Sequence, residues 1–171
     1  EFRRVLFRSD ASAFVARSGE VVRTEMPALV SRLQPDLVVL MSTVDDVADH
    51  EWTSGEGTLA PTDPRFAARL RSQYRAATRT AFEAGAARVV WVVAPVPTSD
   101  FSTPDLNVRA SHLAVHDAIR DVAASEAATV VAEMDDWLTG AGFADDPDWR
   151  PDGTHLSEQA ARRLAEEWFG P

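Results

Sequence analysis

The sequence predicts an α/β protein in which a parallel β-sheet lies between layers of helices. Short, unbroken apolar runs alternate along the chain with longer segments of helical periodicity. This alternation is typical of parallel strands joined by right-handed helical crossovers. The 171 residues suit one domain, and a hydrophobic fraction of 45% is enough to fill a core. We therefore expect one compact unit with helices on both faces of the sheet.

Three apolar runs are predicted to be strands, and the first two are expected to be buried. They span residues 37–41, 88–94 and 129–134. The first run begins after the break at Pro35-Asp36, and the second ends at Pro95 and Pro97, which cannot continue a central strand. Polar residues follow the carboxyl end of each run.

Helical periodicity predicts four helical regions between and around these strands. Residues 11–33 fit one or two helices, interrupted at Gly19 and Pro27. A helix is expected from Pro64, with Asp63 among its N-cap candidates, to Gly85. Its core-facing residues would be Phe66, Leu70, Tyr74, Ala77 and Ala81. A third helix is expected over 108–124, with Leu113, Ile119 and Val122 inward, and a last one from the N-cap Ser157 to about Trp168.

The composition excludes several classes of function. A formal charge of −10 and a pI near 4.8 argue against a nucleic acid or an anionic membrane as the main partner. All seventeen basic residues are arginines, so no lysine is available for a Schiff base. There is no cysteine, which excludes disulfides, thiolate metal sites and cysteine nucleophiles. No apolar run approaches the roughly 20 residues of a membrane span.

The first residues do not fit the rest of the pattern. The chain opens at Glu1 rather than Met, and residues 1–9 show neither helical periodicity nor alternation. We expect residues 1–9 to be a non-native or disordered start, and residues 10–171 to form a single domain whose true N-terminus is missing. The compartment stays open; a bacterial, extracytoplasmic location is compatible with the sequence.

The most informative motif lies near the end of the chain. It reads Arg150-Pro151-Asp152-Gly153-Thr154-His155-Leu156-Ser157. A histidine that acts as general base needs a carboxylate to fix its tautomer and stabilise its imidazolium form, and one turn supplies both groups here. Pro151 restricts the entry to the turn and Gly153 relieves its backbone. The alternative is an Asx turn in which Asp152 caps local N–H groups and His155 is a surface residue.

The predicted strands and the polar segments that follow them indicate one edge of the sheet as the place of a site. In parallel sheets of this kind, ligands bind at the carboxyl ends of the strands. The segments that follow those ends are 42–52, 95–107 and 135–155, and they hold nearly all the unusual polar residues. A site built from these segments is therefore expected.

Together these features resemble the SGNH (GDSL-type) esterase and acyl-hydrolase superfamily, especially its high-GC actinobacterial branch. The resemblance covers most of residues 35–169 and depends on four stretches: Gln34 to Leu40, the polar loop 42–49, residues 85–95, and Asp152-Gly153-Thr154-His155 with its helix. It implies the SGNH hydrolase fold, a flavodoxin-like three-layer α/β/α arrangement, here lacking its first elements.

The resemblance also implies an activity. Members of this family hydrolyse or transfer acyl esters with Ser, His and Asp and with no metal or organic cofactor, so His155 would be the base and Asp152 its orienting carboxylate. Ser42, Thr43 and Asp45 occupy the loop where the family places an oxyanion-hole asparagine. An ionised Asp45 would oppose an oxyanion, which leaves backbone N–H groups or the Thr43 hydroxyl for that role.

The expected substrate is a small-molecule or glycan acyl ester, with no nucleic acid as partner. The resemblance also allows a membrane acyltransferase domain in the full-length protein.

The nucleophile is where the chain departs from the family pattern. Family members carry Gly-Asp-Ser after the first strand, whereas this chain has Ser9-Asp10-Ala11-Ser12, in a different order and too close to Pro35 for the missing elements to fit. A G-x-S-x-G elbow is also absent. We expect the nucleophile to lie on sequence upstream and the chain alone to turn over very little substrate.

Two alternative functions remain open at this stage. The first is a non-catalytic glycan- or protein-binding domain on the same scaffold, which would use the loop tryptophans Trp52 and Trp149. The second is a metal-dependent hydrolase that uses Asp45, Asp49, His50 and His155.

His112 and His116 have a spacing at which two imidazoles can share a zinc ion. The adjacent glutamate of the zinc proteases is missing, so a solvated helix face is the preferred interpretation of these histidines.

Overall fold

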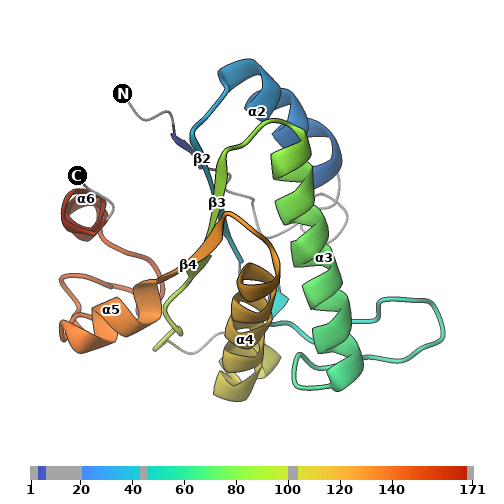
Figure 1. The fold of residues 1–171 in the computed structure, drawn as a ribbon. Helices are drawn as coiled ribbons and strands as arrows, with labels where there is room; N and C mark the ends of the chain where they lie inside the picture. Colours follow the sequence, from blue (N-terminus) through green and yellow to red (C-terminus); the bar gives the residue numbers. More distant parts are fainter. Residues whose placement is uncertain (1–3, 7–20, 43–45, 100–103, 169–171) are drawn as a thin grey trace.

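The fold is a parallel sheet of four strands in a computed structural model, which describes residues 4–6, 21–42, 46–99 and 104–168 (Figure 1). The strands are β1 (Arg4–Leu6), β2 (Leu37–Met41), β3 (Arg88–Val93) and β4 (Thr129–Glu133). They lie in the order β1-β2-β3-β4, and every neighbouring pair is parallel. The three strands predicted from apolar runs are confirmed to within one residue at their ends.

The short first strand was not predicted. Arg4–Leu6 pairs with the first three residues of β2, although the sequence of residues 1–9 carries no recognisable strand pattern. Three residues are too few to show a periodicity, and parallel pairing uses only backbone groups. The domain boundary at residue 10 stays a prediction.

Five α-helices accompany the described strands: α2 (Met26–Leu33), α3 (Pro64–Glu83), α4 (Arg109–Ser125), α5 (Met134–Gly140) and α6 (Glu158–Glu167). Two short helical turns, η2 (Val21–Glu25) and η4 (Pro104–Asn107), precede α2 and α4. Helix α3 begins as predicted, because the Asp63 carboxylate accepts a hydrogen bond from the Arg65 N–H at 2.8 Å and Pro64 follows it. It ends just before Gly85, which has a φ of +107°.

The layers follow from the strand order. Since the strands succeed one another in chain order, right-handed crossovers place all connecting helices on one face. Helices α2, α3 and α4 cover that face, and α5 and α6 cover the other (Figure 1). The predicted three-layer α/β/α, flavodoxin-like arrangement is thus confirmed. Within the described segments, none of the helices has both the length and the hydrophobicity that crossing a bilayer requires.

The side chains of the core agree with most of the predicted helix faces. All five residues of the predicted α3 stripe are buried. On α4, Ile119 and Val122 are fully buried as expected, but Leu113 is 40% exposed and was wrongly placed inward. The buried stripe of α4 instead passes through His112, Val115, His116 and Ile119.

Helix α5 is the main element that the sequence did not reveal. No helix is predicted in the polar segment 135–155, whereas β4 leads directly into α5 at Met134. With seven residues, α5 is too short for a clear helical period, and Asp135 and Asp136 in its first turn resemble turn residues. Its buried residues Met134 and Leu138 pack on the sheet face opposite α3.

Candidate active site

The turn before α6 joins a carboxylate to an imidazole. Asp152 Oδ2 lies 2.7 Å from His155 Nδ1. A carboxylate can only accept hydrogen bonds, so Nδ1 carries the hydrogen and Nε2 of the neutral ring has a free lone pair. The His155 side chain is 79% exposed. The ring is therefore held at one nitrogen and open to solvent.

The other carboxylate oxygen of Asp152 organises the backbone of the same turn. Asp152 Oδ1 accepts hydrogen bonds from the N–H groups of Thr154, at 2.9 Å, and His155, at 2.7 Å. The Asx turn and the carboxylate–imidazole pair, considered as alternatives from the sequence, are thus present together. One side chain fixes both the turn and the ring.

These hydrogen bonds also set the charge of the pair. The side-chain hydrogen bond from His155, followed by the backbone bonds from His155 and Thr154, holds the pKa of Asp152 well below its ordinary value. Asp152 therefore stays ionised at neutral and mildly acidic pH. A permanent anion beside Nδ1 is what an imidazole needs if it is to accept a proton at Nε2.

The turn is fastened to the loop that follows β3. Thr98 N–H donates to the Gly153 carbonyl oxygen at 2.9 Å, and the Ser99 and Thr154 hydroxyls are 2.7 Å apart. Gly153 has a φ of +71°, and a Cβ added there would lie 2.7 Å from the Ser99 backbone nitrogen. Only glycine fits this contact. The attachment places the Asp152–His155 pair beside a segment that follows the carboxyl end of β3.

Arg150 ties the start of the turn to the same loop. Arg150 is only 3% exposed. Its guanidinium donates to the Val96 carbonyl oxygen through both terminal nitrogens at 3.1 Å, and to the Ala144 carbonyl oxygen at 2.9 Å. Burial lowers the Arg150 pKa, while the charge of Asp135 opposes that effect. Asp135 in turn accepts from the Val96 N–H at 3.0 Å. This role could not be predicted from the sequence, where Arg150 stands out only by its position directly before the turn.

A comparison with protein families identifies the scaffold. The model of the GDSL-like lipase/acylhydrolase family matches residues 4–163. The chain belongs to this family. The match spans the four strands of the described residues and the Asp152–His155 turn, in agreement with the wider resemblance inferred from the sequence. No curated protein matches the chain.

In this GDSL-family chain, a buried tyrosine is hydrogen-bonded to the segment that follows β2. The Tyr74 hydroxyl, from α3, donates to Asp46 Oδ2 at 2.9 Å, and Ser42 at the start of this loop is 8% exposed. Burial, with the charge of Asp46, raises the Tyr74 pKa. Thr43 and Asp45 lie outside the described residues, and the oxyanion role of this loop stays a prediction.

Of the residues suggested for a metal site, His50 has other partners. The His50 ring packs against Trp52 and Phe66, with centroids 4.5 and 4.8 Å away, and its Nδ1 lies 2.9 Å from the Ala48 carbonyl oxygen. Among the described residues, no three histidine, aspartate or glutamate side chains are grouped so that they could hold a metal ion.

The two histidines of α4 are not on a solvated face, and that interpretation was wrong. His112 and His116 are 6% and 4% exposed, because they continue the buried stripe of Val115 and Ile119. His112 Nε2 lies 2.8 Å from the Leu106 carbonyl oxygen, whereas His116 Nδ1 has no hydrogen-bond partner in the described part of the chain. Burial lowers the pKa of both histidines.

The tryptophans do not form the exposed surface that a binding module would need. Trp149 is 6% exposed and stacks on Phe143 at 3.9 Å, with the Arg163 guanidinium 5.1 Å from its ring. Trp137 belongs to α5. Trp52 packs edge-on against Phe66. These rings cover the edges of the core, so Trp149 offers no face to a ligand.

Proposed function

We propose that this chain is the base-bearing part of a serine ester hydrolase or acyl transferase in which Asp152 and His155 assist a serine. The observation that supports it is the 2.7 Å contact between Asp152 and His155 Nδ1, on a turn fastened beside the carboxyl end of β3. Membership of the GDSL-like family supports the reaction class.

In this proposal His155 Nε2 takes the proton of the serine hydroxyl as its oxygen attacks the ester carbonyl. Asp152 holds the ring in the required tautomer and stabilises the imidazolium ion. His155 then gives the proton to the departing alcohol, which leaves an acyl-enzyme. A water molecule or a second alcohol attacks the acyl-enzyme, losing its proton to His155, and the serine recovers its hydrogen when the product leaves.

The nucleophile belongs outside the described residues in this proposal. Within the described part of the chain, no serine hydroxyl is hydrogen-bonded to the His155 ring: Nδ1 of the ring bonds Asp152, and the Ser99 hydroxyl bonds Thr154. Ser12 and serines encoded upstream are the candidates. The narrower assignment to the actinobacterial branch is part of the same proposal.

The test is hydrolysis of p-nitrophenyl acetate by the 171-residue chain and by a longer chain with its natural upstream coding sequence. His155→Ala and Asp152→Asn should each lower kcat by about 10³ to 10⁴-fold in the active form. The first variant lacks the base, and the second lacks the carboxylate that keeps the hydrogen of the His155 ring on Nδ1.

Glu158→Gln is the matched control, since it removes a nearby carboxylate that is 91% exposed and pairs only with Arg162 among the described residues. It should leave kcat unchanged. Hydrolysis by the longer chain that persists in His155→Ala would contradict the proposal.

A further inference from the structure

Val96, in the loop after β3, is held at both of its backbone polar groups. Its N–H donates to Asp135 Oδ1 at 3.0 Å, and its carbonyl oxygen accepts from Arg150 at 3.1 Å. Asp135 lies in the first turn of α5, whereas Arg150 begins the turn before α6. Two residues after Val96, the Thr98 N–H donates to the Gly153 carbonyl oxygen of that turn. Helix α5, the loop after β3 and the turn are therefore joined through one short segment.

Arg150 carries a charge that is removed from solvent. The residue is 3% exposed, its terminal nitrogens donate to neutral carbonyl groups, and its Nε has no hydrogen-bond partner in the described part of the chain. A buried charge is unfavourable unless an opposite charge compensates it. Burial accordingly lowers the pKa of Arg150, and of the carboxylates that oppose this effect Asp135 acts most strongly, ahead of Asp145 and Asp152.

The other two carboxylates are less suited to hold Arg150 in place. Asp145 is exposed, so solvent screens its charge. Asp152 is already bonded to His155 Nδ1. Asp135 is half-buried, and it bonds the same residue, Val96, that Arg150 bonds. It is therefore the carboxylate that is able to fix the position of the Arg150 guanidinium.

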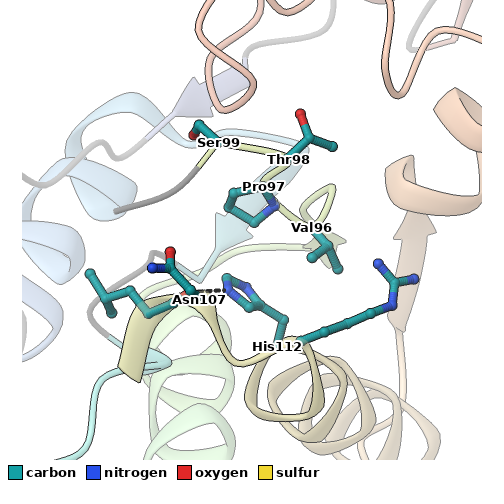
Figure 2. A pocket seen from close by; sticks show the side chains of 8 residues that line it. Val96, Pro97, Thr98, Ser99, Asn107 and His112 are labelled. Carbon is teal, nitrogen blue, oxygen red and sulfur yellow. Dashed lines mark hydrogen bonds between the residues drawn. The ribbon is translucent and has the colours of Figure 1, made fainter. Parts of the chain in front are cut away.

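The charge of Asp135 also reaches helix α4. Burial lowers the pKa of His112 and His116, and the charge of Asp135 opposes that effect in both. Figure 2 shows His112 across a small pocket from Val96 and Pro97. Both histidines are neutral above about pH 7, because burial holds their pKa below the ordinary 6.5. Arg150 is then the buried cation on which Asp135 acts.

We propose that Asp135 is a positioning residue of the active site. It holds the Val96 N–H and compensates the charge of Arg150, and in this way it keeps the turn that carries His155 against the loop after β3. The inference rests on the proposed esterase function, because it concerns the geometry of the same Asp152–His155 pair. Asp135 contacts no reacting atom and acts through Val96 and Arg150.

The test compares two substitutions of Asp135 with one of its neighbour. Asp135→Asn keeps an oxygen that can accept from the Val96 N–H but removes the charge, whereas Asp135→Ala removes both. Asp136→Asn is the matched control, since Asp136 is exposed and also lies in the first turn of α5. The loss of a favourable charge at the helix N-terminus is common to the two asparagine variants.

Amide hydrogen exchange of the 171-residue chain, measured by NMR at about pH 7.5, reports on the attachment without catalysis. The Thr98 amide is protected by its bond to the Gly153 carbonyl oxygen. Its exchange is divided by that of the β3 amides, which open only on global unfolding. This ratio should rise about tenfold in Asp135→Asn and about a hundredfold in Asp135→Ala, and it should not change in Asp136→Asn.

A double-mutant cycle tests whether Asp135 acts through Arg150. In an Arg150→Met chain the charge that Asp135 compensates is gone, so adding Asp135→Asn should change the Thr98 ratio by less than about twofold. An undiminished tenfold effect in that chain would contradict the proposal. The single variants of Asp135 decide the question even if Arg150→Met does not fold.

Activity of the longer chain provides a separate readout. Asp135→Asn should lower kcat about tenfold and leave KM unchanged, because a displaced His155 slows the reaction without weakening binding. The proposal is wrong if Asp135→Asn and Asp136→Asn exchange Thr98 equally, or if Asp135→Asn changes KM alone.

These outcomes differ from a failure of the proposed function. Hydrolysis that persists in His155→Ala, together with faster Thr98 exchange in Asp135→Asn, would contradict the esterase and keep the role of Asp135 in holding the turn. Hydrolysis that depends on His155, together with unchanged Thr98 exchange, would do the reverse.

Discussion

Replacing Gly153 by alanine should separate the turn from the loop that holds it. The residue has a φ of +71°, and the new Cβ would lie 2.7 Å from the Ser99 nitrogen and 2.8 Å from the Thr98 hydroxyl oxygen. The left-handed backbone costs an alanine about 1–2 kcal/mol. Overpacking against backbone adds about 1–3 kcal/mol.

A second glycine provides the control for this experiment. Gly142 has a φ of +78°, and a Cβ added there meets nothing within 4 Å. Gly142→Ala therefore carries the backbone cost alone, and any effect on the unfolded chain is common to both variants. The free energy of unfolding should fall by roughly 1–3 kcal/mol more in Gly153→Ala than in Gly142→Ala.

Urea unfolding of the two variants measures this difference directly. Activity gives a second readout. To lengthen the contact between the new Cβ and the Ser99 nitrogen from 2.7 Å to an ordinary 3.4 Å, the turn must move by about 0.7 Å. A displacement near 1 Å can lower the rate by about 10²-fold, and Gly142→Ala should not share this loss. Equal stability and equal activity of the two variants would refute the idea that the Gly153 contact positions the turn.

Two further predictions concern buried ionisable side chains. Arg150→Met removes the hydrogen bonds to the Val96 and Ala144 carbonyls, so chemical unfolding should show a loss of about 2–4 kcal/mol; wild-type stability would contradict the anchoring role. Burial lowers the pKa of His112 and His116, so the unfolded chain binds protons first as the pH falls. Unfolding free energy should be constant above about pH 7 and decrease as the pH falls through about 6.5, less steeply in His116→Phe; an unchanged slope in that variant would contradict the assignment.

Local features of this chain could be predicted from sequence because their causes are local. The runs of β2 and β3 are continuous and apolar because both faces of a central parallel strand are buried, whereas β4 lies at the edge of the described sheet and its Val130 is 55% exposed. The Asp152–His155 contact spans three residues, so one turn type almost fixes it.

Long-range contacts could not be predicted in the same way. Arg150 contacts Val96 across 54 residues, and Ser99 contacts Thr154 across 55. Nothing in the composition of either segment indicates its partner. The burial of His112 and His116 could have been predicted, because their spacing continues the buried stripe of Ile119 and Val122. The prediction of a solvated face relied on the polarity of histidine instead.

Labelling with a fluorophosphonate probe, located by peptide mass spectrometry, tests the role of the Asp152–His155 pair most directly. In the chain with its natural upstream sequence, a single serine should be labelled, and His155→Ala should slow that labelling by at least about 10³-fold. A serine that reacts equally fast without the His155 imidazole, or no labelled serine at all, would contradict the account.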